Sequence, residues 1–299
     1  MNADKLNIPV NLSISAKIKA YFDLVKFRLS FLVAFTGGMG YLLGTDLLVW
    51  STFIAFLLGG FLMTGAANTI NQIIEKDLDK LMVRTSNRPL PTGRLSVSEA
   101  IGFCVTSGSL GFALLYSFTG LLPALLTLIS LILYGFVYTP LKRKSSVAVL
   151  VGAFPGALPP LIGWAAATGG ISIEGLLLFG IQFMWQFPHF WAIAWVLDEE
   201  YKKAGFKLLP SGGGKDLNTA IQIMIYTLML IPLGLIPAKL GITGINSAII
   251  ATVCGVVFLM QTFSLMKSGT NKAALKIMFG SFLYLPIVQI AFVLDKIIK

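Results

Sequence analysis

Residues 49–79 read VWSTFIAFLLGGFLMTGAANTINQIIEKDLD, an apolar run that ends in a polar and acidic stretch. The apolar part, residues 49–70, is long enough to cross the hydrocarbon core of a bilayer, which takes about 20 residues of helix. Similar runs recur along the chain, and 56% of its 299 residues are hydrophobic while only 12% are charged. An ordinary soluble protein carries about twice that charged share. We therefore predict an integral membrane protein.

Nine apolar runs are long enough to be membrane-spanning helices. The sequence therefore predicts an all-α integral membrane protein with nine transmembrane helices. Residues 1–27 would form a cytoplasmic N-terminal segment, and residues 28–295 a single transmembrane domain. In the fifth run we expect the prolines to break the helix, either as a kink or where it lines a cavity. The predicted runs are 28–45, 49–70, 98–117, 121–138, 147–167, 173–196, 218–237, 246–265 and 275–294.

The positive charges predict how the chain is threaded. With the N-terminus in the cytoplasm, only Lys239, Lys296 and Lys299 of the 23 Lys and Arg residues fall outside. This asymmetry follows the positive-inside rule, and it accounts for the net charge of +10 without nucleic-acid binding. The polar start of the chain, which contains Lys5, lacks the apolar core of a signal peptide. We expect a multi-pass protein of a bacterial inner (cytoplasmic) membrane with its C-terminus outside.

Asn71, Glu75 and Asp79 follow the second run at intervals of four residues. On an α-helix they would cover an arc of about 80° over a length of about 12 Å, and Asn68 would join the same face. Carboxylates that end an apolar span are costly unless they line a polar cavity. Such oxygen ligands suit Mg²⁺, which binds through one or two carboxylates together with substrate phosphates. We predict Asn71, Glu75 and Asp79 as metal ligands.

The next loop contains Arg84, Arg88 and Arg94 among proline and glycine residues. Guanidinium groups present a planar set of donors that matches phosphate oxygens. The metal-binding face and the arginine loop together predict a diphosphate site, although spacing alone also fits a solvated helix end with ordinary cytoplasmic arginines. Ser96 and Glu99 then fit a capping box that begins the third helix.

The sixth run ends in Trp185-Gln186-Phe187-Pro188-His189-Phe190 and is followed by Asp198-Glu199-Glu200-Tyr201-Lys202. His189 is the only histidine, and an ionisable residue within a span is a candidate functional residue. It is either a ligand of haem iron or a neutral histidine bonded to a neighbouring helix. The aromatic residues around it would form an interfacial belt or flank a porphyrin. If the second and sixth helices are neighbours, the acidic run would hold a second Mg²⁺ or orient a substrate.

Together these segments resemble the protohaem IX farnesyltransferases (haem O synthases) of the intramembrane prenyltransferase superfamily. The resemblance implies nine transmembrane helices around a central cavity that opens to the cytoplasmic side. It also implies Mg²⁺-dependent cleavage of farnesyl diphosphate and transfer of the farnesyl group to the 2-vinyl group of haem B, with water addition, to give haem O. The resembling residues, within about residues 20–290, are Asn71–Asp79, Arg84, Arg88, Tyr138, Lys142, Arg143, residues 159–164 and Trp185–His189.

The resemblance assigns roles to particular residues. Farnesyl diphosphate and haem B are the implied substrates, and the protein would lie in a lipid bilayer. A haem A synthase is the implied acceptor of the product. Glu75 stands where many members have Asp, and the superfamily's second Asp-x-x-x-Asp pattern is absent. The implied catalytic residues are Asn71, Glu75, Asp79, Arg84 and Arg88, and the implied substrate-binding residues are Asn68, Tyr138, Lys142, Arg143, His189, Glu199, Glu200, Tyr201 and Lys202.

Two other functions remain open from the sequence. A quinone-pathway prenyltransferase would share the metal-binding face but accept an aromatic acid, which the Trp185–His189 segment argues against. A transporter would also have broken helices and intramembrane charges. Against it, both acidic runs are predicted at one membrane face and not at the midplane.

Overall fold

The computed structural model describes residues 13–210 and 214–298, and the regular structure in those residues is helical throughout. Residues 1–12, which include Lys5 of the predicted cytoplasmic segment, lie outside the described residues, as does Lys299. The helices are α1 Ile14–Val25, α2 Phe27–Gly44, α3 Trp50–Asp79, α4 Val97–Thr119, α5 Leu121–Ile132, the π-helical segment Leu133–Tyr138, α6 Thr139–Leu141, α7 Val147–Thr168, α8 Ile173–Val196, α9 Asp198–Lys203, α10 Leu217–Lys239, α11 Ile245–Ser268 and α12 Asn271–Ile298.

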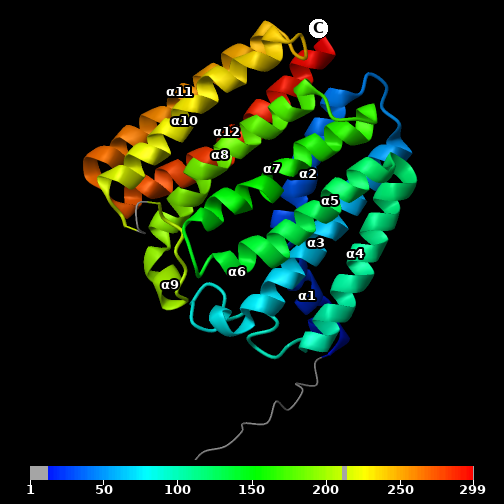
Figure 1. Cartoon of the computed structure of the whole chain (residues 1–299), viewed down its shortest axis with the longest axis vertical. Coiled ribbons are helices and arrows are strands. Elements are labelled where there is room, and N and C mark those ends of the chain that lie inside the picture. The colour runs from blue at the N-terminus through cyan, green and yellow to red at the C-terminus, as the bar shows by residue number, and fades with distance from the viewer. Residues whose placement is uncertain (1–12, 211–213, 299) are drawn as a thin grey trace, which may run out of the picture.

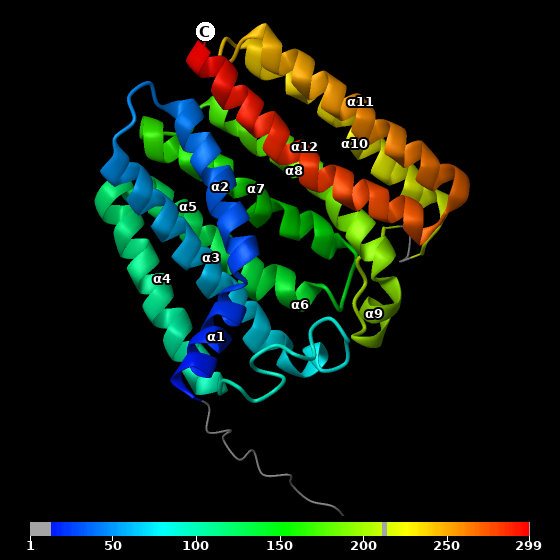
Figure 2. The ribbon, with the colours of Figure 1, turned by 180° about the vertical axis from the view of Figure 1, so that it is seen from behind.

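The long helices lie side by side in one bundle (Figure 1). The short helices α1 and α9 lie at one end of it, and the C-terminus lies at the other end in both views (Figures 1 and 2). The loop between α3 and α4 is at the same end as α1 and α9. The two acidic runs of the sequence are therefore at one end of the bundle, as the threading predicts.

Eight of the described helical segments are long and apolar enough to cross a membrane, namely α2, α3, α4, the continuous α5–α6 segment, α7, α10, α11 and α12. Helix α8 is not among them, although its 24 residues suffice in length. Gln182, Gln186, Pro188 and His189 lower its hydropathy. An all-α multi-pass membrane protein is confirmed, whereas the ninth span and the side on which the cavity opens stay predictions.

Helix α7 is continuous from Val147 to Thr168, so the expectation that the prolines interrupt the fifth span is wrong. Pro155 and Pro159 do line a cavity, as the other part of that expectation has it. A proline removes the hydrogen bond to the carbonyl group four residues before it. For Pro159 and Pro160, those carbonyl groups accept instead from Ser130 Oγ at 3.1 Å and Gln182 Nε2 at 2.8 Å. Side chains of the neighbouring helices α5 and α8 thus replace the missing backbone donors inside the bundle.

Glycines bring α2 and α7 into backbone contact. A Cβ atom at Gly163 of α7 would lie 1.9 Å from the carbonyl oxygen of Gly37, and one at Gly40 of α2 would lie 2.1 Å from that of Pro160. Small residues let membrane helices approach closely. Dispersion forces between the packed atoms then hold the helices together, because no hydrophobic effect acts between helices in lipid. This contact fixes the relative position of two helices that line the functional site.

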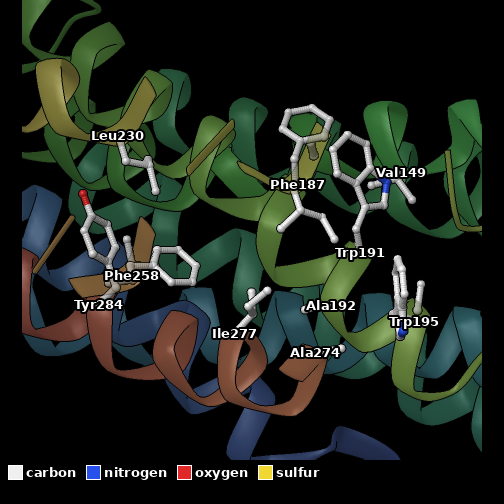
Figure 3. Close-up of a cluster of buried hydrophobic side chains, with 14 of the residues drawn as sticks. Val149, Phe187, Trp191, Ala192, Trp195, Leu230, Phe258, Ala274, Ile277 and Tyr284 are labelled. Carbon is white, nitrogen blue, oxygen red and sulfur yellow. The ribbon is translucent and has the colours of Figure 1, made fainter. Parts of the chain in front are cut away.

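A second group of packed side chains joins α8 to the C-terminal helices (Figure 3). Phe187, Trp191 and Trp195 on one side of α8 are at most 6% exposed, and they share a buried cluster with Phe258 of α11 and Ile277 of α12. Phe187, Trp191 and Trp195 therefore serve mainly to fix α8 in the bundle.

Gly163→Ala should destabilise the protein by about 1–3 kcal/mol, because the added methyl group would force α2 and α7 apart. Gly180→Ala is the matched control, since a Cβ atom at Gly180 of α8 would meet nothing within 4 Å. The control should gain about 0.5–1 kcal/mol from the helix preference of alanine. Thermal unfolding of the detergent-solubilised variants measures the difference, and equal unfolding temperatures would contradict the close contact.

Candidate active site

The C-terminal part of α3 turns its polar side chains into the protein and not toward lipid. Asn68, Asn71, Gln72, Glu75 and Asp79 each expose 3% or less of their surface. The four-residue spacing predicted this face, and the structure adds Gln72 to it. Burying two carboxylates in an apolar bundle is costly unless they are paired, so their partners define the site.

Asn68 and Gln72 hold the end of α1. Asn68 Nδ2 donates to the Val25 carbonyl at 3.2 Å, and Gln72 Nε2 donates to the Leu24 carbonyl at 2.6 Å. The last carbonyl groups of a helix lack intrahelical partners, and these two side chains provide them. Lys26 follows directly with φ of 53°, a left-handed conformation that residues other than glycine seldom adopt. The junction between α1 and α2 thereby holds Lys26 beside α3.

Lys26 is a site residue that the sequence did not indicate, because a lysine before the first span fits the ordinary charge asymmetry. Its Nζ donates to Asn71 Oδ1 at 3.2 Å. Burial lowers the pKa of Lys26 well below its ordinary value, and the nearby Arg88 and Lys142 lower the pKa further. A lysine held beside two other cations is best stabilised when an anion joins them. Its position therefore indicates a site for an anionic ligand.

Each of the two carboxylates has a cation beside it. Arg88 Nη1 donates to both carboxylate oxygens of Asp79 at 2.8 Å. The Lys142 ammonium group forms an ion pair with Glu75 and lies 5.1 Å from the ring centroid of Tyr138. Burial lowers the pKa of Lys142, and the charge of Glu75 opposes that effect. Carboxylates and cations therefore alternate at the end of α3.

The π-helical segment Leu133–Tyr138 packs against this part of α3. Such turns are rare and are frequent at functional sites. Thr139 Oγ1 accepts from Asn71 Nδ2 at 3.2 Å and donates to the Tyr134 carbonyl at 2.8 Å. Tyr134 and Tyr138 both line the adjoining cavity. Tyr138 was predicted, but Tyr134 was missed, since nothing in the sequence marks the wider helical turn.

A cavity of about 390 Å³ extends from these tyrosines into the bundle. Its volume falls in the range of about 300–1,000 Å³ that is usual for ligand sites. Asn68, Tyr138 and His189 line it together, so the polar face of α3 and the only histidine share one space. Leu32 of α2 and Phe282 of α12 also line it and are 43% and 42% exposed. The cavity therefore joins Asn68 on the polar face of α3 to the lipid-facing surface.

The acidic run after α8 reaches the loop after α3 but not its carboxylates. Glu200 Oε2 accepts from the Val83 backbone N at 2.6 Å, so the ends of α3 and α8 are neighbours. Asp198 pairs with Lys202 at 2.8 Å, and the Glu199 side chain is 78% exposed. Among residues 13–210 and 214–298, no three His, Cys, Asp or Glu side chains are grouped to hold a metal ion. A second metal at Asp198–Glu200 stays a prediction.

The other predicted substrate-binding residues divide into two groups. Tyr201 is mostly buried, which raises its pKa, and the charge of Arg84 opposes that effect, which places both side chains at the edge of the site. Arg143 and Lys202 are exposed, and Lys202 is engaged by the acidic run. The structure thus gathers Arg84 and Tyr201 near α3 and leaves Arg143 and Lys202 at the surface.

The residues on α3 fit a magnesium ion chemically. Asn71, Glu75 and Asp79 offer one amide oxygen and two carboxylates on one buried face. Mg²⁺ prefers such hard oxygen ligands and commonly leaves its remaining positions to water or substrate phosphates. The present partners of the two carboxylates are side-chain cations, which a metal ion can replace electrostatically.

The model of the UbiA prenyltransferase family matches residues 31–285. The chain belongs to this family. This UbiA-family chain is 56% identical over 284 residues to the protoheme IX farnesyltransferase of Cytophaga hutchinsonii, which covers 95% of the chain and 99% of that protein. It is 47% identical over 291 residues to the protoheme IX farnesyltransferase of Christiangramia forsetii. That alignment covers 95% of this chain and 96% of the relative.

Solved structures of the UbiA family share the fold. A UbiA homolog from Archaeoglobus fulgidus bound to GPP and Mg²⁺ aligns with a TM-score of 0.66. The alignment covers 91% of this chain and 99% of that one at 18% sequence identity. An identity this low shows the common fold alone, so the roles of individual residues rest on the geometry described above.

Arg88→Met should destabilise the metal-free protein by about 3–5 kcal/mol, because Asp79 would be left as a buried anion without its partner. Arg84→Met removes the same charge from the same loop, but Arg84 is exposed, so that control should change stability little. Unfolding in detergent with a chelator present measures both. Equal effects of the two substitutions would show that Asp79 does not depend on Arg88.

Proposed function

We infer that this chain transfers the farnesyl group of farnesyl diphosphate to the 2-vinyl group of haem B, with addition of water, to give haem O and diphosphate. Membership of the UbiA family and the near full-length likeness to farnesyltransferases support this reaction. In the structure, one observation carries it: the charged cluster around Glu75 and Asp79 reaches an apolar cavity through Tyr138, which lines the cavity and lies 5.1 Å from the Lys142 ammonium group. A diphosphate matches the first part, and an isoprenoid chain and a porphyrin match the second.

We propose that the cations around α3 bind the diphosphate. Arg88 and Lys142 pair with the two carboxylates, and the Lys26 amino group beside Asn71 would carry a proton and bind the substrate once an anionic diphosphate joins it. Arg84 at the edge of the site would contact the outer phosphate oxygens. Donors placed in advance where negative charge develops are usually the largest contribution to catalysis. These side chains would therefore favour cleavage of the C–O bond by stabilising the leaving group.

Asn71, Glu75 and Asp79 are the proposed magnesium ligands. When bound, Mg²⁺ would neutralise charge on the diphosphate as it leaves. Lys142 and Arg88 would then turn from the carboxylates to the phosphate oxygens, because Mg²⁺ would neutralise the charge of Glu75 and Asp79 in their place. Lys26, which donates to Asn71 Oδ1, would orient that amide toward the site. A UbiA homolog with the same fold has been solved bound to GPP and Mg²⁺, which supports a site for a magnesium ion and a prenyl diphosphate in this chain.

The allylic cation left by cleavage would form beside Tyr134 and Tyr138. Aromatic faces attract cations within about 6 Å of the ring centroid. The apolar cavity would keep water from the cation until the vinyl carbon of haem attacks it. Water then adds to the second cation, on the former vinyl group, and loses a proton, which leaves a hydroxyethylfarnesyl substituent. Asn68 and His189, on the same lining, are the proposed contacts to the organic substrates.

The remaining predicted roles concern the cytoplasmic edge of the site. Exposed Arg143 and Lys202 would attract the anionic substrates from solution, which is how surface charge raises association rates. Glu199, Glu200 and Tyr201 would position the loop over the bound diphosphate, which the hydrogen bond from the Val83 backbone N–H to Glu200 supports. We propose the inner membrane of a bacterium, with the N-terminus in the cytoplasm, and a haem A synthase as acceptor of the product.

The test is incubation of the purified protein with haem B, farnesyl diphosphate and Mg²⁺, followed by mass analysis of the porphyrin. We expect a mass increase of one farnesyl group plus one hydroxyl group, because the added water loses a proton. Asp79→Asn should lower turnover by about 100-fold or more while the protein still inserts and folds. A wild-type protein that leaves haem B unchanged but prenylates an aromatic acid would contradict the proposal, and so would near-normal haem O from Asp79→Asn.

Lys26→Met should raise the KM for farnesyl diphosphate by about 10-fold to 100-fold, because a charged hydrogen bond to the diphosphate is lost. The KM for haem B should stay the same, and Lys26→Arg should restore part of the affinity. Lys19→Met removes a charge from the exposed side of α1 and is the control. An unchanged KM for farnesyl diphosphate in Lys26→Met would remove Lys26 from the diphosphate site.

A further inference from the structure

The imidazole ring of His189 is fixed on several sides at the lining of the cavity. It is 7% exposed. Trp185, one turn earlier on α8, stacks on it with ring centroids 4.5 Å apart and an interplanar angle of 16°. Phe282 of α12 meets it edge-on at 5.0 Å. The ring therefore has little freedom to turn, and its two nitrogen atoms have separate surroundings.

Nδ1 of His189 is bound to Ser281 of α12 and not to a substrate-facing group. The distance from Nδ1 to Ser281 Oγ is 2.8 Å. Ser281 Oγ in turn donates its single hydroxyl proton to the Met278 carbonyl at 2.6 Å, and a carbonyl can only accept. The hydroxyl oxygen therefore accepts from Nδ1, which must carry the ring proton. In the neutral ring, Nε2 then keeps its lone pair.

Nε2 is the nitrogen left for a ligand. Within the described part of the chain, Nδ1 is the ring atom that has a hydrogen-bond partner. His189 lines the cavity, and Nδ1 is held by Ser281, so Nε2 is the ring nitrogen that a ligand in the cavity would use. Trp185 Nε1 donates to the Ser281 carbonyl at 2.9 Å, so the same residue of α12 holds both the histidine and the ring stacked on it.

We propose that Nε2 of His189 is an axial ligand of the iron of haem B, and that Ser281 is the positioning residue that fixes its tautomer. This inference rests on the proposed function, since haem B must be the substrate. The bond is a coordinate bond in which the imidazole lone pair is donated to iron, and no electron or proton is transferred. Histidines that bind metals usually donate their other N–H to an acceptor, which orients the ring and raises its basicity.

Ligation at this point has a consequence for the reaction. The porphyrin would be anchored at its centre against α8 and α12, while Asn68 of α3 and Tyr138, which adjoins Lys142, line the same cavity. The position of two reactants relative to each other is itself a large catalytic effect. The iron ligand would therefore fix how far the porphyrin edge lies from the diphosphate, and the walls of the cavity would select which vinyl group meets the allylic cation.

The test compares haem binding and iron coordination in four proteins: wild type, His189→Gln, Ser281→Ala and Ser281→Thr. Resonance Raman spectra of the ferrous haem complexes report the iron–histidine stretch, and titration reports affinity. Gln fills similar space and can still bond Ser281, so His189→Gln separates ligation from packing. We expect it to lose the iron–histidine signal and to weaken haem B binding by about tenfold or more.

The serine variants test positioning. Ser281→Ala should keep the ligand but shift the iron–histidine stretch and weaken haem binding by about tenfold, while Ser281→Thr, which keeps the hydroxyl, should resemble wild type. The KM for farnesyl diphosphate should not change in either. Metal-free protoporphyrin IX should bind wild type and His189→Gln equally, because it has no iron to ligate.

Two results distinguish a failure of the iron-ligand assignment from a failure of the proposed function. A wild type that makes haem O but shows no iron–histidine signal, or shows the same signal in His189→Gln, would overturn the ligand assignment alone. A wild type that forms no haem O from haem B and farnesyl diphosphate would overturn the proposed function on which the assignment rests.

Discussion

The cost of burying two carboxylates in an apolar bundle is the constraint on which the rest of the site depends. Glu75 and Asp79 lie on the inner face of α3, and anions are tolerated there only beside cations or a metal ion. Arg88 and Lys142 provide those cations, and Lys26 adds a further positive charge. The same cluster can hold a magnesium ion and a diphosphate, because the carboxylates bind the one and the cations bind the other.

The apolar half of the site depends on hydrogen bonds that neighbouring helices donate to α7. Pro159 and Pro160 free two carbonyl groups of that helix, and Ser130 and Gln182 donate to them from α5 and α8. Glycines draw α2 against α7 at backbone distance. These contacts fix the helices around a cavity of about 390 Å³ that adjoins the charged cluster. A polar head and an apolar chain of one substrate can therefore be bound at the same time.

Much of the fold and half of the site follow from local patterns. Apolar runs predict the helices, and the spacing of Asn71, Glu75 and Asp79 predicts their common buried face, because both depend on the helical period alone. Lys26 was missed because its role depends on an irregular junction between α1 and α2. The proline effect on α7 was misjudged, since the compensating donors come from other helices. The role of the acidic run at Asp198 could not be predicted from the sequence alone, because it depends on the ion pair between Asp198 and Lys202 in the structure.

We propose that α3 binds a metal-diphosphate complex through Glu75 and Asp79. The most direct measurement is the anomalous scattering of Mn²⁺ in crystals grown with that ion and an unreactive farnesyl thiodiphosphate. We expect an anomalous peak between these two carboxylates and the diphosphate, with Lys26 and Arg88 on phosphate oxygens. A diphosphate bound elsewhere, or a metal ion at Asp198–Glu200 while Glu75 remains paired with lysine, would contradict it.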